Sequence, residues 1–282
     1  MEPESDFSTV LEDGLSLRRR RELIAEYVLG RDSVSARELS STFDVSLMTI
    51  HRDLDELERQ GVLRKIRGGA TPQPSSLFES SVRFRKVTAT REKEALARFA
   101  LDQIEPGQSV LIDDSTTCLA LARLIPQQAP ITVITNFLCS INELKGKPGV
   151  HLIALGGDYL ERHDALVGLI CETAINALHA DVLFLSCSAV SNGFALHQEQ
   201  AIVSVKRAML GSATRSILLI DHNKVGKVAL HRLAPLETFD LVVVDGGVSD
   251  AQLAELRESH TSVAVAPLVR SALEHYGSGE DA

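Results

Sequence analysis

Residues 35–67 of the chain read SARELSSTFDVSLMTIHRDLDELERQGVLRKIR. Ser35 and Glu38, three residues apart, form the pattern of a capping box, which predicts that a helix begins here. Ser46 can cap a second helix after a short turn. The apolar residues of that second helix recur every three or four positions and share one face; they are Leu47, Ile50, Leu54 and Leu57. Gly61 stands where a left-handed residue ends a helix, so the stretch predicts two short helices joined by a turn.

The polar side of the second helix is suited to DNA. In a helix-turn-helix the first residues of this helix reach base edges in the major groove, where Arg52 can read guanine or clamp a phosphate. Three cations within residues 64–67, followed by two glycines, suit a hairpin wing on the phosphate backbone. A helical bundle with a solvated charged face is the plainer alternative, but it does not explain the cationic, glycine-ended ribbon. The predicted DNA-binding residues are Ser46, Met48, Thr49, His51, Arg52, Arg59, Arg64, Lys65 and Arg67.

Length and composition limit the class of protein. A chain of 282 residues has room for two domains, and no run of 18 apolar residues is present, so no membrane span is expected. The first 17 residues lack the basic start and apolar stretch of a signal peptide. The four cysteines are scattered without a C-x-x-C pair, which favours a reduced, cytoplasmic protein. We predict no metal site, no cofactor and no catalytic residue.

The distribution of charge matters more than its sum. The whole chain carries −9, but residues 18–71 hold 11 basic and 9 acidic residues and are the only net-positive segment, at +2. Such a weak positive charge predicts modest non-specific affinity, so tight DNA binding is expected to rely on dimerisation, and we predict a homodimer or homotetramer.

The chain pattern predicts five consecutive regions. A helix over residues 17–29 places Leu17, Ile24 and Val28 inward, and a second helical pattern covers 85–99. The predicted regions are a disordered extension (1–15), a winged helix-turn-helix DNA-binding domain (16–71), a linker with the start of a connecting helix (72–91), an effector-binding sensor and oligomerisation domain (92–270) and a flexible tail (271–282).

Short apolar runs alternate with helical stretches after residue 108, which predicts a Rossmann-like, mostly parallel α/β domain. The predicted strands are 109–113, 131–135, 150–155, 182–186, 216–220, 241–245 and 262–266. The predicted helices are about 117–125, 137–144, 168–178, 200–213 and 250–258.

Polar clusters follow four of these strands. Ligands of such sheets bind at the carboxyl ends of the strands, so the clusters are expected to meet at one edge. Hydroxyls at a helix start can hold the phosphate of a sugar phosphate, although Ser and Thr also cap helices routinely. The predicted effector-binding residues are Asp113, Ser115, Thr116, Thr117, Thr135, Asn136, Gly156, Gly157, Asp221 and Lys224.

The motifs from residue 17 to 247 resemble the DeoR family of bacterial sugar-catabolism regulators. The family segment V-S-x-x-T-I-R-R-D-L matches residues 45–54, and G-G-A matches 68–70. In the second half, D-x-G-T-T matches 113–117, K-R-A-M matches 206–209 and D-S-S-K-F-G matches 221–226. The resemblance implies a winged helix that binds double-stranded operator DNA and a sensor similar in fold to ribose-5-phosphate isomerase. It also implies a phosphorylated sugar effector and, more commonly, repression of a carbohydrate-catabolism operon.

The chain departs from the family pattern at named positions. His51 replaces the first of two arginines, Ser115 replaces a glycine, and His222 and Asn223 replace two serines. The acidic pair before K-R-A-M is absent. The departures in the sensor leave open an effector outside the usual class, and the sequence does not fix the sign of regulation.

The alternative function is a sugar-phosphate isomerase-like enzyme with an appended helical domain. Moving a proton between neighbouring carbons needs a positioned general base, for which Asp221, Glu199 and Lys224 are available. No partner acid stands at a fixed spacing from them, so we predict a regulator and not an enzyme.

Arg52→Ala tests the assignment of the recognition helix. Because Arg52 points away from the predicted apolar face, the variant should keep its fold and lose specific operator binding, as measured by a gel-shift titration. Normal operator binding by the folded variant would show that another element reads the DNA.

Overall fold

The computed structural model describes residues 17–268, with gaps at 30, 32, 60, 73–81, 87 and 260–261. Internal contacts divide the chain into two units, residues 1–88 and 89–282. The predicted extension (1–15), the predicted tail (271–282) and much of the predicted linker lie outside the described residues.

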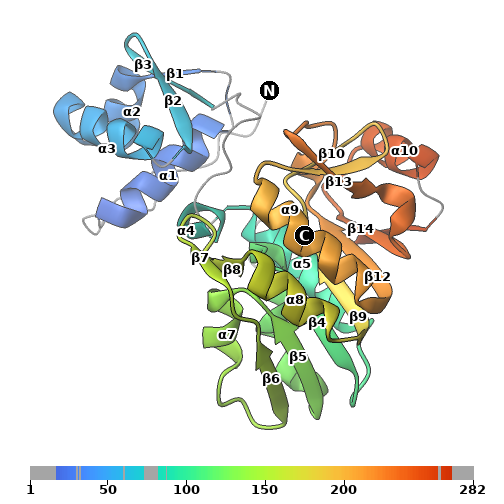
Figure 1. Ribbon diagram of the computed structural model, residues 1–282. Coiled ribbons are helices and arrows are strands. Elements are labelled where there is room, and N and C mark those ends of the chain that lie inside the picture. The colour runs from blue at the N-terminus through green and yellow to red at the C-terminus, as the bar shows by residue number, and fades with distance from the viewer. Residues whose placement is uncertain are drawn as a thin grey trace, which may run out of the picture. The chain divides into compact units, whose positions relative to one another are not determined.

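The first unit is a compact helical domain with a hairpin. Its elements are α1 (Leu17–Leu29), β1 (Val34–Ser35), α2 (Ala36–Thr42), α3 (Leu47–Arg59), β2 (Leu63–Ile66) and β3 (Gly69–Pro72) (Figure 1). Both predicted caps are confirmed: the Ser35 hydroxyl accepts from the Glu38 amide at 3.1 Å, and that of Ser46 accepts from the Thr49 amide at 3.2 Å. Gly61 has φ +70°, the left-handed conformation expected after α3.

The core of this unit follows the predicted apolar faces except at the helix ends. Ile24 and Val28 of α1 and Ile50, Leu54 and Leu57 of α3 are buried. The prediction that Leu17 and Leu47 point inward is wrong, because their side chains are 54% and 42% exposed. Each is the first residue of its helix and precedes the part of the helix that meets the core.

The predicted wing is present. Strands β2 and β3 pair antiparallel, with Leu63 opposite Pro72 and Ile66 opposite Gly69, and β3 also pairs with β1. The turn between them contains Gly68 at φ +86°, while a Cβ on Gly69 would lie 2.1 Å from the carbonyl oxygen of Val34.

These two glycines make a matched pair of tests. Gly68→Ala meets open space and should cost only the strain of a left-handed residue, about 1–2 kcal/mol of unfolding free energy. Gly69→Ala must push β3 away from β1 and should cost at least twice as much. Urea unfolding of both variants measures this difference, and equal costs would contradict the close packing of β1 on β3.

The predicted helix over 85–99 is wrong as one element. The structure has α4 (Val82–Arg85) and α5 (Thr90–Leu101), and Ala89 between them has φ +51°. A left-handed residue cannot continue a right-handed helix, so the chain turns before α5 begins.

All seven predicted strands form one parallel sheet, which confirms the predicted α/β fold. They are β4 (Ser109–Ile112), β5 (Ile131–Thr135), β6 (Val150–Ala154), β9 (Ala180–Leu185), β12 (Ala213–Ile220), β14 (Leu241–Asp245) and β15 (Val263–Ala266). The order across the sheet is β15-β14-β12-β9-β4-β5-β6, and every neighbouring pair is parallel. From β4 the chain adds β5 and β6 on one side, and then adds β9, β12, β14 and β15 on the other side. A topological switch point therefore lies between β4 and β9.

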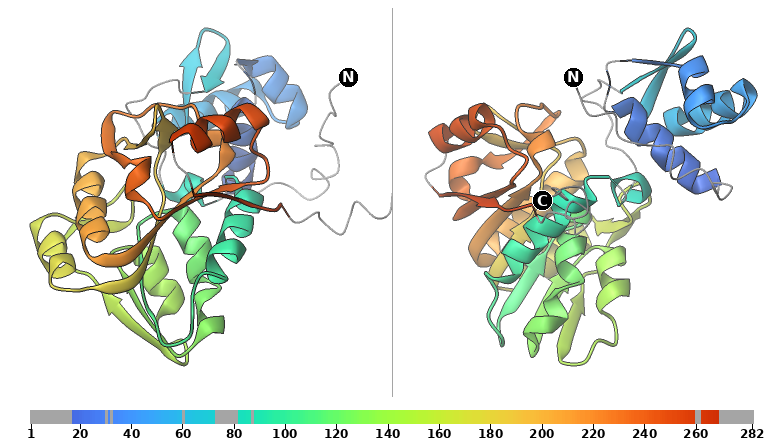
Figure 2. Two further views of the ribbon diagram at one scale, coloured as in Figure 1. Left: turned by 90° about the vertical axis from the view of Figure 1, so that its right-hand side faces the viewer. Right: turned by 180° about the vertical axis from the view of Figure 1, so that it is seen from behind.

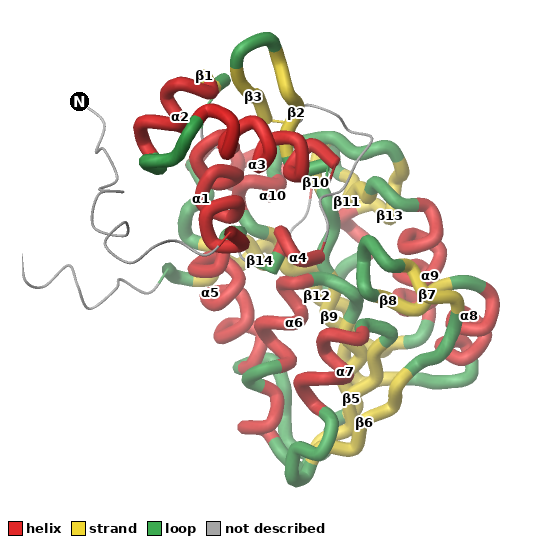
Figure 3. The backbone as a smooth tube through the Cα atoms, turned by 90° about the vertical axis from the view of Figure 1, so that its left-hand side faces the viewer, coloured by secondary structure: helices red, strands yellow, loops and turns green. Residues whose placement is uncertain are grey.

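Helices cover both faces of this sheet (Figure 2). The helices α5, α6 and α7 lie along one face (Figure 3), and α8, α9 and α10 cover the other. Their remaining bounds are α6 (Thr116–Ala122), α7 (Leu138–Leu144), α8 (Leu169–Asn176), α9 (Gln200–Gly211) and α10 (Asp250–Ser259), with short 3-10 turns at Ile125–Gln128, His222–Lys224 and Leu236–Thr238. Each face has its own apolar core, so both sides of the strands are buried.

Two small antiparallel sheets were not predicted. One pairs β7 (Asp158–Leu160) with β8 (Ala165–Val167), and the other has the order β10-β11-β13 (Ala189–Ser191, Phe194–His197, His231–Pro235). These strands are only three to five residues long, which gives little sequence periodicity. They bring His163 and His197 to the sensor site described below.

Candidate functional site

The predicted DNA-reading residues lie on the polar side of α3. Met48 is 64% exposed, and Ser46, His51 and Arg52 are also exposed. Thr49 is half-buried, and its hydroxyl lies 2.9 Å from that of Ser46. The start of α3 therefore presents polar side chains outward, while its opposite side is fixed in the core.

The predicted cations differ in how they are held. Arg59 forms a 2.5 Å ion pair with Glu56, and Lys65 forms an ion pair with Asp55. Arg64 and Arg67 are exposed on the wing. A DNA phosphate that binds Arg59 or Lys65 would replace the carboxylate partner that each cation already has. Surface ion pairs contribute little to stability, so this replacement costs little free energy.

Sequence reasoning missed the function of Asp53. Its carboxylate is 1% exposed and accepts from Nε of Arg20 at 2.7 Å and from Nε of Arg21 at 2.8 Å. These bonds tie α1 to α3 and fix the recognition helix. They also occupy Arg20 and Arg21, which belong to the 11 basic residues counted in segment 18–71.

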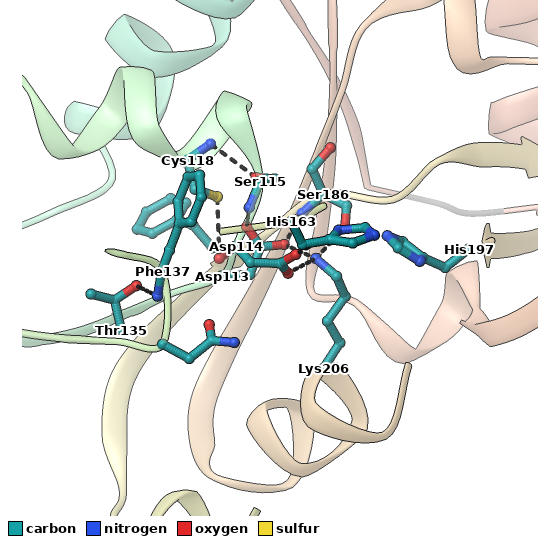
Figure 4. A network of polar contacts seen from close by, with 12 residues as sticks. Asp113, Asp114, Ser115, Cys118, Thr135, Phe137, His163, Ser186, His197 and Lys206 are labelled. Atoms are coloured by element: carbon teal, nitrogen blue, oxygen red, sulfur yellow. Dashed lines mark hydrogen bonds and ion pairs between the residues drawn. The ribbon is translucent and has the colours of Figure 1, made fainter. Parts of the chain in front are cut away.

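The sensor unit has a buried ion-pair cluster at the switch point (Figure 4). Asp113 follows β4 and is fully buried; one of its oxygens accepts from the Ser115 amide at 2.9 Å, and the other accepts from the Ser186 amide at 2.7 Å. Lys206 of α9, 1% exposed, forms a short ion pair with Asp113 and donates to the Ser186 carbonyl at 3.1 Å. Asp113 therefore has its hydrogen-bonding capacity largely filled by the protein.

Asp114 extends this cluster toward two histidines. Its Oδ1 lies 3.1 Å from Nζ of Lys206, and its Oδ2 lies 3.3 Å from Nδ1 of His163. The ring of His163, from the turn between β7 and β8, lies 5.8 Å from the ring of His197 at the end of β11 (Figure 4). His197 Nδ1 accepts from the Glu199 amide at 3.1 Å, which favours the tautomer protonated at Nε2.

Mutual attraction keeps this cluster charged despite its burial. Burial by itself would raise the pKa of Asp114, but Lys206 and His163 outweigh it and hold that pKa well below its ordinary value. Burial would likewise lower the pKa of Lys206, but Asp113 and Asp114 outweigh it and raise that pKa above its ordinary value.

The loop expected to hold phosphate is partly filled by its own hydrogen bonds. The Ser115 hydroxyl accepts from the Cys118 amide at 3.0 Å and so caps α6. Ser115, Thr116 and Thr117 are all buried. The hydroxyl of Thr117 has no hydrogen-bond partner among the described residues.

The predicted residues at the end of β5 make hydrogen bonds to the backbone, whereas the two glycines that follow β6 differ in their surroundings. Thr135 accepts from the Phe137 amide at 3.2 Å, while Asn136 donates from Nδ2 to the Leu166 carbonyl at 2.8 Å. Gly156 is exposed. A Cβ on Gly157 would lie 2.4 Å from the Val167 carbonyl, so the close approach at Gly157 is made by the backbone of β8.

The predicted pair after β12 joins the cluster from its other side. Asp221 and Lys224 lie 3.3 Å apart, and Nζ of Lys224 donates to the Ser186 hydroxyl at 3.0 Å. The lysine side chain is 22% exposed. His222, which replaces a family serine, is held by Asp245 through a 2.8 Å contact of its Nδ1.

The structure thus joins Asp113, Asp221 and Lys224 through one polar network, and the predictions missed its central members. Those members are Ser186, Lys206, His163 and His197. A signal for Lys206 was present, because it stands at helical spacing between Ile202 and Met209 on the buried side of α9. The two histidines lie on short strands and loops, where spacing gives no such signal.

Metal-binding clusters and membrane-spanning helices are both missing from the described part of the chain. No group of three or more His, Cys, Asp or Glu side chains there could hold a metal ion. No helix among the described residues is long and apolar enough to cross a membrane.

Comparison with known proteins gives matches over both units. Residues 20–75 match the DeoR-like helix-turn-helix domain, and residues 88–246 match the DeoR C-terminal sensor domain. The chain is 31% identical to the putative aga operon transcriptional repressor of Escherichia coli O157:H7, over 86% of this chain and 92% of that protein. It is 31% identical to the glycerol-3-phosphate regulon repressor of Escherichia coli (strain K12), over 86% and 96%. It is 32% identical to the L-fucose operon activator of Haemophilus influenzae, over 87% and 98%.

Lys206→Met tests the buried cluster. Removing the ammonium leaves two buried carboxylates without their cation, which should cost about 3–5 kcal/mol of unfolding free energy near pH 7. In the variant the folded-state pKa of Asp114 rises, because burial still disfavours its charged form and the Lys206 ammonium is gone, so stability is regained as the pH falls. The loss of unfolding free energy relative to the wild type should therefore become smaller between pH 7 and pH 5, as measured by urea titrations.

Lys147→Met, at an exposed position, is the matched control and should stay within about 0.5 kcal/mol of the wild type. A loss of stability in Lys206→Met that does not change with pH would mean that the Lys206 ammonium does not hold Asp114 ionised in the folded protein.

Proposed function

The chain belongs to the DeoR family of DNA-binding transcriptional regulators, and from this premise we propose that it represses a carbohydrate-catabolism operon and leaves its operator when a phosphorylated sugar binds the C-terminal unit. Membership in this family confirms the predicted regulator and excludes the isomerase-like enzyme as the function of the chain.

The DNA-binding half of the proposal rests on the outward face of α3 and the wing. Arg52 and His51 are exposed at the start of α3, and Arg64 and Arg67 are exposed on the wing. The proposed division of labour is base contact by the residues of α3 and phosphate contact by the cations of the wing.

The effector half rests on the polar cluster at the switch point, which is the observation that carries the proposal. Sites for small molecules in open α/β sheets lie at this place. Within the cluster Lys224 is a cation with a partly exposed side chain, and it can meet a phosphate without leaving the network. The hydrogen bonds of Asp113 are already made within the protein, so in the proposal it does not contact the ligand. It holds Lys206 and the loop at Ser115 in place.

The sign and the nature of the effector are proposed from the relatives. Two of the three relatives described above are named as repressors and one as an activator, and their names refer to the aga operon, the glycerol-3-phosphate regulon and the L-fucose operon. Repression is the sign that two of these three names carry. Relief of repression by a phosphorylated sugar is proposed from the match to the family's sensor domain.

Control of DNA binding requires two states of the protein that bind the ligand with different affinity. We place these states in a cytoplasmic homodimer or homotetramer, because two winged helices on one operator multiply a weak single contact. Among the effector-binding residues predicted from sequence, Lys224 is the proposed cation of the site, while Asp113 supports the site without contacting the ligand.

The test is operator release. Full-length protein selects its site from random duplex DNA, and fluorescence anisotropy then follows that duplex while sugar phosphates are added. We expect one sugar phosphate to weaken DNA binding at least tenfold, and Lys224→Gln to lose this response while keeping its affinity for DNA.

Arg52→Ala serves as the control that should not select a site at all. If the wild type selects an operator but no phosphorylated sugar changes its affinity, the proposed effector class is wrong and the DNA-binding function stands.

A further inference from the structure

Three buried side-chain oxygens near the carboxyl ends of β4 and β5 have no hydrogen-bond partner among the described residues, and a fourth, Asp114 Oδ2, has only the 3.3 Å contact with Nδ1 of His163. The three are Thr117 Oγ1, Asn136 Oδ1 and Ser140 Oγ. Each of the four residues is 0–1% exposed. Leaving a buried polar atom without a partner is costly, and native proteins do so rarely, so several together indicate a place for a bound molecule or ordered water.

The topology brings these atoms to the carboxyl ends of two neighbouring strands. Asp114 follows β4 and Thr117 lies in the first turn of α6, while Asn136 follows β5 and Ser140 lies in the first turn of α7. Strands β4 and β5 pair with Ile112 opposite Thr135, and α6 packs against α7. The corner formed by these four residues thus belongs to the β4–β5 side of the switch point.

The chemistry of the corner is that of hydrogen-bond acceptors. Asn136 must donate from Nδ2 because its partner is the carbonyl of Leu166, so its Oδ1 is the atom left to accept. Asp114 Oδ2 is a carboxylate oxygen and can only accept while ionised, and the low pKa of Asp114 keeps it so. Thr117 and Ser140 add two hydroxyls, each of which both donates and accepts.

The charge of the corner disfavours a phosphate. Asp113 and Asp114 carry two negative charges against the one positive charge of Lys206, so these three side chains together are net negative. The partly exposed cation, Lys224, lies on the other side of Ser186. A donor-only group such as an ammonium would leave the hydroxyl hydrogens of Thr117 and Ser140 without acceptors.

We propose that the corner formed by Asp114, Thr117, Asn136 and Ser140 binds the uncharged hydroxyl-bearing end of the effector, a polyol chain, and that any phosphate lies at the Lys224 end. Ligand hydroxyls donate to Asp114 Oδ2 and Asn136 Oδ1 and exchange hydrogen bonds with Thr117 and Ser140. The Asp113–Thr117 loop then reads the hydroxyls, in place of the phosphate expected from its sequence. This assignment rests on the proposed effector function and fixes the direction of the ligand in the site.

The test uses full-length protein and sugar alcohols of four to six carbons, with and without a terminal phosphate, together with inorganic phosphate alone. Thermal shift identifies binders, and isothermal titration measures their affinity. We expect a polyol-containing compound to bind, and Asp114→Asn to weaken it at least tenfold. The same variant should leave the affinity for inorganic phosphate within twofold, while Lys224→Gln weakens inorganic phosphate at least tenfold.

Ser140→Ala separates recognition from folding. Because it removes a buried hydroxyl without a described partner, the ligand-free variant should melt at the wild-type temperature or above it, yet bind the polyol at least fivefold more weakly. Ser216→Ala is the matched control: that hydroxyl, buried in the first half of β12, contacts Asp240 at 3.2 Å, so the variant should melt lower and bind the polyol normally.

Three results would overturn the assignment. One is tighter binding of inorganic phosphate or of a sugar-alcohol phosphate by Asp114→Asn, which would place the phosphate beside Asp114. Another is unchanged polyol affinity in both Asp114→Asn and Ser140→Ala. The third is the absence of binding by any compound, which would mean that water alone fills the corner. If uncharged polyols bind but no sugar phosphate binds, the proposed phosphorylated effector is wrong, and the assignment of the corner to ligand hydroxyls stands.

Discussion

The buried ammonium of Lys206 between Asp113 and Asp114 is the interaction on which the sensor unit depends. Taking three charges out of water is costly, and only their close contact and the added hydrogen bonds from Ser186 and Ser115 offset that cost. The contact joins α9 to the end of β4 across the switch point. It therefore sets the position of the loop before α6, from which the site is built.

The same network gives the site two unlike ends. On one side of Ser186, Lys224 offers a cation whose side chain is partly exposed, and on the other side Asp114 leads to an acceptor-lined corner. A ligand with a charged end and a hydroxyl end would match this polarity in one direction only. Because Lys206 and Lys224 both bond to Ser186, a ligand that moves one lysine acts on the surroundings of the other.

The DNA-binding unit also has a buried carboxylate that is paired with basic side chains. Asp53 is buried within α3 and takes two arginines from α1, so a paired carboxylate fixes the angle of the recognition helix. In both units a buried acid holds a functional element in place, while neighbouring side chains meet the ligand. Removing the basic partner of such a carboxylate is strongly destabilising, because it leaves an uncompensated charge in the interior.

The sequence by itself determined the winged helix-turn-helix, all seven strands of the parallel sheet and the edge at which the polar residues gather, because caps, apolar periodicity and strand ends are local patterns. Only the tertiary structure decided which polar residues meet. Lys206 lies 93 residues from Asp113 along the chain, and His163 reaches Asp114 from a small sheet without a sequence signal. It also decided that Leu17 and Leu47 stay exposed and that Gly157 packs on Val167, since burial depends on neighbours distant along the chain.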